Sequence, residues 1–179
     1  MKVLLSRSRY CLTVVSLAAA TLLLGCGYAL VGRVSSIPED IQDIYVAPME
    51  NRTQRAQLEQ FLTQAITDEL VTRRRFNLVG GQDGADAELH GTVKSFRVTP
   101  VTFDEDGRGQ EYEISIVADV SFERAGGDEV VWSNDSYLFK EIYEIDSSAD
   151  DYFDQENVAI LEASVRFAET MVSDLLEGF

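Results

Sequence analysis

The residue best suited to covalent chemistry is Cys26, because its thiol can be acylated, and so can its amine once the preceding bond is cut. Cys26 follows the small residue Gly25, with Leu23 three positions before it, at the end of an uncharged apolar stretch over 10–24. Three basic residues and no acidic residue precede that stretch. A basic start, an apolar stretch and a small residue at the cut are typical of a secretory signal. We therefore predict that residues 1–25 are removed and that Cys26 carries lipid.

The segment Leu23-Leu24-Gly25-Cys26 matches the lipobox of bacterial lipoprotein precursors. This match implies an N-acyl group such as palmitate and an S-diacylglycerol on Cys26, which together hold a protein firmly on a bilayer. The alternatives are an ordinary secretory signal and a spanning helix, but a spanning helix needs about 20 apolar residues. Because Gly27 replaces the aspartate that retains many Gram-negative lipoproteins in the inner membrane, we expect the inner leaflet of the outer membrane. We expect no other cofactor.

Few other residues point to catalysis or metal binding. His90 is the only histidine, and Cys11 lies inside the predicted signal, so the mature chain has no thiol for a disulfide or a zinc site. The sequence also lacks a nucleophile-elbow motif, a P-loop and a dinucleotide fingerprint. His90 falls on the polar side of an alternating strand, which favours a solvated side chain. We therefore predict that the protein is not an enzyme and holds no metal.

Acidic residues dominate the mature chain. Removing three of the 15 basic residues with the signal, against 31 acidic ones, leaves a net charge of −19. Such a charge disfavours nucleic acid as a partner. The acidic segments 104–107 and 144–151 contain oxygen ligands that calcium accepts, but neither fits an EF-hand loop. Solvated acidic turns are the favoured interpretation of both segments.

The spacing of apolar residues predicts two helices and a set of strands. Apolar residues recur every three or four positions over 54–75, after a possible N-cap at Thr53, and again from Val158 to Phe179. Strands are predicted over 43–47, 85–98, 111–123 and 130–143. Alternation changes phase after Val93, which indicates a bulge or a twist that exchanges the two faces of the strand. Of these strands, 111–123 alternates most regularly.

This order of elements predicts an α+β fold. We expect a two-layer sandwich, with a mostly antiparallel sheet of about four strands and two helices packed on one face. The expected division is a signal peptide over 1–25, an acylated cysteine and short connection over 26–42, and a single periplasmic domain over 43–179. We expect the aromatic residues to pack in the core rather than to form a binding surface. They are Tyr112, Trp132, Tyr137, Phe139 and Tyr143.

The assembled motifs resemble the LptE-type lipopolysaccharide-assembly lipoproteins. The resemblance rests on Cys26-Gly27-Tyr28, Asn51-Arg52-Thr53, the segment from Ala85 to Gly91, and Val131-Trp132. It implies two helices on a four-stranded sheet and no enzymatic activity. It also implies that the protein faces the periplasm or sits inside an LptD-type outer-membrane β-barrel. There it would help the barrel to fold, plug it and support lipopolysaccharide delivery to the cell surface.

Lipopolysaccharide is anionic, so the net charge of the mature chain opposes direct binding unless basic residues gather locally. We take Lys94, Arg97 and Arg108 as candidate lipopolysaccharide contacts, from their charge and approximate location. No motif of the family assigns this role to them. Binding to the barrel is therefore ranked above direct binding to the lipid.

The segment from Val46 to Thr53 also resembles lipoproteins that activate peptidoglycan synthases or belong to curli-type secretion pores. A synthase activator must reach away from the outer membrane, whereas residues 27–42 extend to at most about 55 Å. Work close to the membrane fits this short connection better. A third class, a lipid-tethered hydrolase, lacks a recognisable catalytic constellation.

Overall fold

The computed structural model describes residues 37–127, 129–144 and 152–178, with the side chains of 152–154 excepted. The described residues belong to one compact unit. The predicted signal, Cys26, most of the connection over 26–42 and the acidic residues over 145–151 lie outside them. The elements in chain order are β1 (Asp43–Val46), β2 (Glu50–Asn51), α2 (Leu58–Arg73), β3 (Asn77–Leu78), β4 (Ala87–Phe103), β5 (Gly109–Arg124), β6 (Val130–Glu144) and α3 (Tyr152–Glu177).

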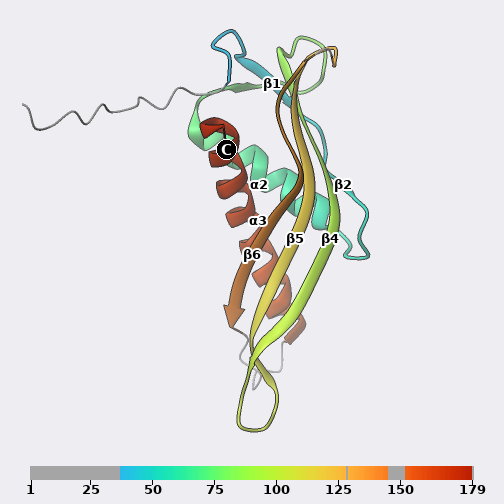
Figure 1. Cartoon of the computed structure of the whole chain (residues 1–179), viewed down its shortest axis with the longest axis vertical. Coiled ribbons are helices and arrows are strands. Elements are labelled where there is room, and N and C mark those ends of the chain that lie inside the picture. The colour runs from blue at the N-terminus through green and yellow to red at the C-terminus, as the bar shows by residue number, and fades with distance from the viewer. Residues whose placement is uncertain (1–36, 128, 145–151, 179) are drawn as a thin grey trace, which may run out of the picture. The chain divides into compact units, whose positions relative to one another are not determined.

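The strands form one sheet in the order β3-β1-β4-β5-β6, with β2 beside β4 (Figure 1). The long strands β4, β5 and β6 pair antiparallel, whereas β1 pairs parallel to β3 and β4, and β2 pairs parallel to β4. Both helices pack on the same side of this sheet, which confirms the predicted α+β class. The sheet has six strands rather than the predicted four or so. The two additional strands, β2 and β3, contain two residues each and are too short to show alternation in the sequence.

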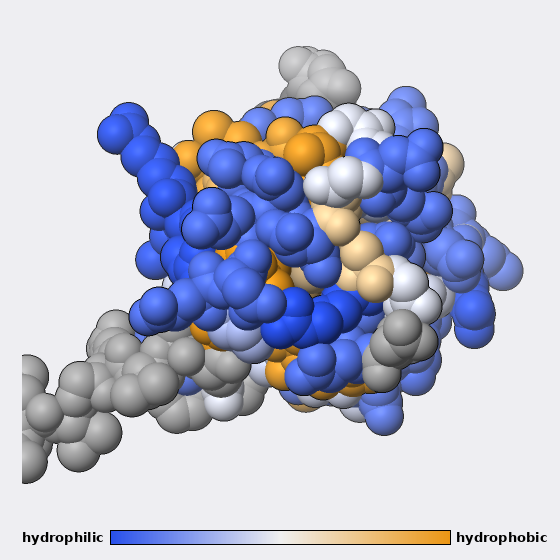
Figure 2. Space-filling model, turned by 90° about the horizontal axis from the view of Figure 1, so that it is seen from above, coloured by the Kyte–Doolittle hydropathy of each residue, from blue (hydrophilic) through white to orange (hydrophobic). Residues whose placement is uncertain are grey.

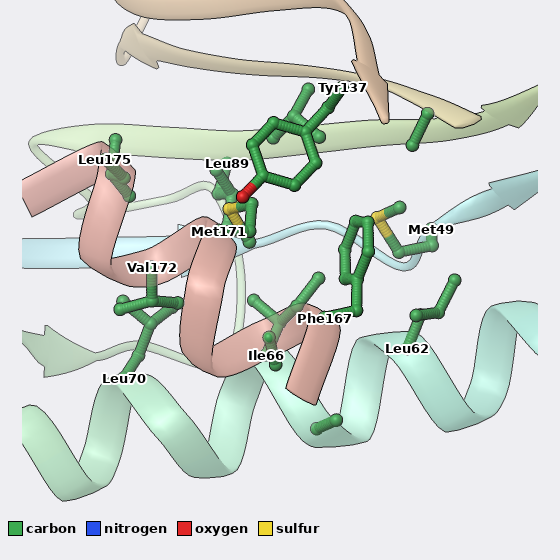
Figure 3. Close-up of a cluster of buried hydrophobic side chains, with 14 of the residues drawn as sticks. Met49, Leu62, Ile66, Leu70, Leu89, Tyr137, Phe167, Met171, Val172 and Leu175 are labelled. Atoms are coloured by element: carbon green, nitrogen blue, oxygen red, sulfur yellow. The ribbon is translucent and has the colours of Figure 1, made fainter. Parts of the chain in front are cut away.

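The core lies between the sheet and the two helices. Every second residue of β5 from Ile114 to Phe122 is buried, as its alternating sequence predicts. In Figure 3, Ile66 and Leu70 of α2 and Phe167 and Met171 of α3 lie close together beneath the sheet. The residues on these faces include the largest fully buried side chains of the described chain, so the hydrophobic effect holds both helices on the sheet.

The predicted change of phase in β4 is a β-bulge at Lys94. Val93 pairs with Ala118 and Ser95 pairs with Val117, so Lys94 is an extra residue in β4. Because side chains alternate along a strand, one extra residue exchanges the two faces. Phe96 and Val98 therefore turn to the helix side of the sheet, opposite Ile116 and Ile114.

The first helix begins later than the sequence predicted. α2 starts at Leu58, after Gln57 in a left-handed conformation with φ 66° and no side-chain cap, so the predicted N-cap at Thr53 is wrong. The Thr53 hydroxyl donates a hydrogen bond to Asn51 Oδ1 instead, at 2.7 Å. This side-chain bond lies within the loop and competes with helix formation there. Among the described residues, neither helix is long and apolar enough to cross a membrane.

A buried tyrosine ties β6 to α3. The Tyr137 hydroxyl donates a hydrogen bond to Asp174 Oδ2 at 2.7 Å. Burial, with this bond and the Asp174 charge, raises the pKa of Tyr137 above its ordinary value of about 10. The folded protein therefore favours the protonated phenol of Tyr137. The stability that this gives is fully present below the pKa of the unfolded chain, about pH 10, and is lost as the pH rises towards the higher pKa of the folded protein.

Replacing Tyr137 by Phe should test this coupling. At neutral pH we expect the free energy of unfolding to fall by about 1–2 kcal/mol, because a hydrogen bond to a charged group is lost. Above pH ~10 the gap between wild type and variant should shrink, since only the wild type carries this phenol. Urea unfolding between pH 7 and 11 measures both effects. A gap that stays constant across this range would contradict the assignment.

Candidate functional site

The sheet leaves one face uncovered by the described helices, and we call it the open sheet face (Figure 1). It is the side of β4, β5 and β6 that points away from α2 and α3. On β5 it presents the odd-numbered residues from Glu113 to Glu123, which are half-buried, while their even-numbered neighbours from Ile114 to Phe122 are buried beneath the helices. Hydrophilic side chains also cover most of the domain end seen in Figure 2, with apolar patches between them.

Two of the three predicted basic residues lie on β4. Lys94, at the bulge, places Nζ 2.5 Å from Asp119 Oδ1 and donates a hydrogen bond to the Asp135 carbonyl at 3.0 Å. Arg97 lies opposite Ser115 and is exposed, and it forms no ion pair within the described part of the chain. The side chain of Arg97 is therefore the more available of the two for an anion.

Register adds a further basic residue that sequence reasoning missed. Ser115 pairs with Arg97 on one side and with Lys140 on the other, so both cations lie on the open sheet face in one row across the strands. Lys140 Nζ contacts Glu113 Oε1 at 2.8 Å. Because Lys140 follows the apolar Phe139, alternation along the strand could have indicated on which face of the sheet Lys140 lies. Which residues lie beside it could not be predicted without the pairing of β5 with β6.

Arg108 lies apart from this row. It sits in the turn between β4 and β5, where Nε is 3.1 Å from Asp104 Oδ2 and Nη2 is 2.6 Å from Asp106 Oδ2. The turn begins after Phe103, six residues beyond Arg97 along β4, or about 20 Å. The structure therefore brings Lys94 and Arg97 to one face and separates Arg108 from them.

The acidic turn at 104–107 is organised by its own hydrogen bonds. Asp104 Oδ1 accepts from the backbone N–H groups of Arg108 at 2.8 Å and of Asp106 at 2.9 Å. The bond from the Arg108 backbone is the main cause that lowers the pKa of Asp104, and the Arg108 side chain adds to it. Among the described residues, no group of three His, Cys, Asp or Glu side chains is arranged to hold a metal ion.

The other residues considered in the sequence, His90 and the five aromatic residues, lie on β4, β5 and β6. His90 Nε2 lies 3.1 Å from Glu88 Oε2, on the polar side as predicted. Trp132, Tyr137 and Phe139 are buried, which confirms their assignment to the core. Tyr112 and Tyr143 are half-buried and stack with ring centroids 5.8 Å apart.

The Asn51-Arg52-Thr53 motif builds the loop that leads into α2. Asn51 Oδ1 accepts from the Thr53 backbone N–H at 2.9 Å, and Nδ2 donates to the Arg55 carbonyl at 2.7 Å. Nδ2 also donates to Glu59 Oε2 in the first turn of α2, at 2.8 Å. One amide side chain thus satisfies several polar groups that join β2 to the helix.

Replacing Asn51 by Ala is expected to lower the free energy of unfolding by about 1–3 kcal/mol, since its half-buried partners lose their hydrogen bonds. The exposed neighbour Gln54 provides the control, because Gln54→Ala should change stability by less than about 0.5 kcal/mol. Thermal and urea unfolding measure both variants. Equal stabilities of the two would contradict the role assigned to Asn51.

An open, mostly antiparallel sheet with two helices on one face defines a small α+β domain with a free sheet surface. The sequence profile of the LptE family, described as lipopolysaccharide-assembly, matches residues 41–175. This range covers most of the chain, so the chain belongs to the LptE family. The sequence has no significant match among curated proteins.

Solved structures share the fold at low sequence identity. Lipoprotein B from Nitrosomonas europaea is 14% identical, with a TM-score of 0.51 over 85% of this chain and 89% of its own. A hypothetical protein from Chlamydia trachomatis is 12% identical, with a TM-score of 0.52 over 77% and 96%. A protein from Xanthomonas campestris is 13% identical, with a TM-score of 0.53 over 79% and 88%. At these identities the similarity establishes the fold alone.

Proposed function

We propose that this protein is a lipid-anchored component of the outer membrane that binds an LptD-type β-barrel, helps it to assemble and plugs it. In this role it supports lipopolysaccharide delivery to the cell surface. The family match over residues 41–175 carries the proposal, because it covers all strands, α2 and all but the last two residues of α3. The role is one of binding and assembly rather than catalysis. Cys26 supplies the anchor in the inner leaflet, with the domain facing the periplasm or inside the barrel.

The same match favours this role over the two alternatives that the segment from Val46 to Thr53 suggested. A peptidoglycan-synthase activator and a curli-type component would each have a different partner. Purification of the full-length lipoprotein from detergent-solubilised envelopes, with mass spectrometry after a high-salt wash, separates these outcomes. We expect a large outer-membrane β-barrel in stoichiometric amount. A penicillin-binding protein, a ring of identical subunits or no partner would overturn the proposal.

Direct contact with lipopolysaccharide is a second part of the proposal, ranked below barrel binding. The row on the open sheet face contains two cations, Arg97 and Lys140, of which Lys140 is already paired with Glu113. Arg97 is exposed, and its guanidinium can donate two parallel hydrogen bonds to the oxygens of one phosphate group. Lys94 stands beside this row but is already engaged by Asp119, and Arg108 would act only from the distant turn.

The lipid part can be tested by charge reversal. Arg97→Glu should weaken binding of lipopolysaccharide to the purified protein while leaving recovery of the barrel unchanged. Arg52→Glu is the matched control, since Arg52 is also exposed but lies after β2 and pairs with Glu50. Equal loss for both variants would indicate a general effect of charge and would remove Arg97 as a contact.

A further inference from the structure

The segment over 37–42, directly before β1, lies outside every helix and strand but is packed into the domain, and we call it the strap. Ile37 and Ile41 are 2% and 0% exposed and belong to the hydrophobic core. The Ile41 backbone N–H donates to the Pro38 carbonyl at 3.3 Å, which closes a turn between the two isoleucines. Segments without regular structure usually run over the surface and are mobile. The strap departs from this rule, because both isoleucines are buried.

The end of the strap is bound by a carboxylate that lies just before β4. Asp86 Oδ2 accepts hydrogen bonds from the backbone N–H groups of Gln42 and Asp43, both at 2.9 Å. These two bonds are the main causes that lower the pKa of Asp86, so the carboxylate is charged at neutral pH. The Gln42 carbonyl in turn accepts from the Asn77 backbone N–H of β3 at 2.8 Å. Both backbone groups of Gln42 are therefore held by the sheet end of the domain.

Two arginines bind the rest of the strap. Arg124, the last residue of β5, contacts both carboxylate oxygens of Asp40, at 2.9 and 3.3 Å. Such a two-pronged contact fixes orientation as well as distance. Arg75, which follows α2, donates to the carbonyls of Pro38 and Ile41 at 3.4 and 3.3 Å. The strap is thus tied at three points, which lie after α2, before β4 and at the end of β5.

These ties shorten the connection between the predicted lipid and the domain. From the sequence alone, residues 27–42 could extend to about 55 Å. With the strap held in the domain, at most residues 27–36 remain between Cys26 and Ile37. Those residues span at most about 35 Å when fully extended. The upper limit on the reach of the domain therefore falls by about 20 Å.

We propose that the strap is a fixed part of the domain and carries the pull of the lipid anchor to the end of the sheet where β4 begins and β5 ends. The turn over 104–107 joins the opposite ends of these two strands, so the strap defines which end of the sheet is tied to the membrane (Figure 1). This inference rests on the lipid anchor of the proposed function but not on the barrel. A reach of about 35 Å suits a protein that works at the membrane.

Hydrogen–deuterium exchange of the detergent-solubilised full-length lipoprotein tests whether the strap is fixed. In the wild type we expect the amides of residues 41–43 to be protected. In the double variant Asp86→Ala/Arg124→Ala they should exchange roughly tenfold faster, because bonds to charged groups are lost. The buried centre of β5 should keep its exchange rate, which separates release of the strap from unfolding of the domain. An unprotected strap in the wild type, or unchanged exchange in the double variant, would overturn the proposal.

Arg55 provides a matched control for Arg124. Its side chain is 29% exposed, against 30% for Arg124, and it also binds two acceptors, Glu156 Oε1 at 3.1 Å and Asn157 Oδ1 at 2.6 Å. None of these contacts involves the strap. Arg55→Ala should therefore leave the exchange of residues 41–43 unchanged. Equally fast exchange in Arg55→Ala and in the double variant would show a general loss of stability and would contradict the role of the strap.

Energy transfer on vesicles tests whether the strap sets the reach. A donor dye is attached to Asp83→Cys, an exposed position three residues before Asp86, and the acceptor dye is on the headgroups of phosphatidylcholine vesicles. We expect more transfer with the strap intact than in the double variant, since release adds the six residues of the strap to the connection. Equal transfer would overturn the proposal. Failure to bind the vesicles would contradict the lipid anchor on which it rests, and neither experiment depends on the barrel.

Discussion

Replacing Phe167 by Ala is expected to lower the free energy of unfolding by about 3–5 kcal/mol. Phe167 is fully buried in α3 and makes edge contacts with Tyr137 and Phe139 of β6, with ring centroids 5.5 and 5.8 Å away. Figure 3 places it between Met49 and Ile66, so its ring joins α3 to the sheet and to α2. Truncation leaves a cavity that these neighbours fill only partly.

Urea unfolding of wild type and variant measures this loss, because the midpoint shifts while the slope reports the surface exposed. Val165, two positions earlier in the same helix, is 45% exposed and provides the control. Val165→Ala should cost less than about 0.5 kcal/mol. A loss below about 1 kcal/mol for Phe167→Ala would show that this ring does not hold α3 to the sheet.

Replacing Cys26 by Ser should abolish lipidation and release the protein from the membrane. A serine hydroxyl does not take the diacylglycerol that the thiol accepts, and without several acyl chains a protein of this charge has little attraction for a bilayer. Labelling of cells with radioactive palmitate, followed by fractionation of the envelope, measures both effects. We expect a labelled membrane protein for the wild type and no label for the variant.

The second cysteine provides the control for this experiment. Cys11 lies within the predicted signal and is removed with it, so Cys11→Ser should leave labelling and membrane association unchanged. Label that persists in Cys26→Ser, or that disappears in Cys11→Ser, would contradict Cys26 as the acylated residue. The outcome is independent of which barrel the protein binds.

The sequence predicted the elements whose periodicity extends over many residues. The alternation from Tyr112 to Phe122 corresponds to β5, and the phase change after Val93 corresponds to the bulge at Lys94. The start of α2 was predicted too early. Thr53 is a residue type that often caps a helix, but here its hydroxyl donates a hydrogen bond to the Asn51 side chain instead. The short strands β2 and β3 were not predicted, because a segment of two residues is too short to show the alternation of apolar and polar residues that marks a strand.

By itself the sequence determined the lipidation motif, the acidic charge, the α+β class and the resemblance to the family, since each depends on local composition or spacing. Only the tertiary structure decided which distant residues meet. Strand pairing joined Arg97 to Lys140 through Ser115, and folding brought Arg124 beside Asp40 of the strap. Bulges shift register by single residues, and a shift of one residue moves every following side chain to the other face, so local pattern does not fix such neighbours.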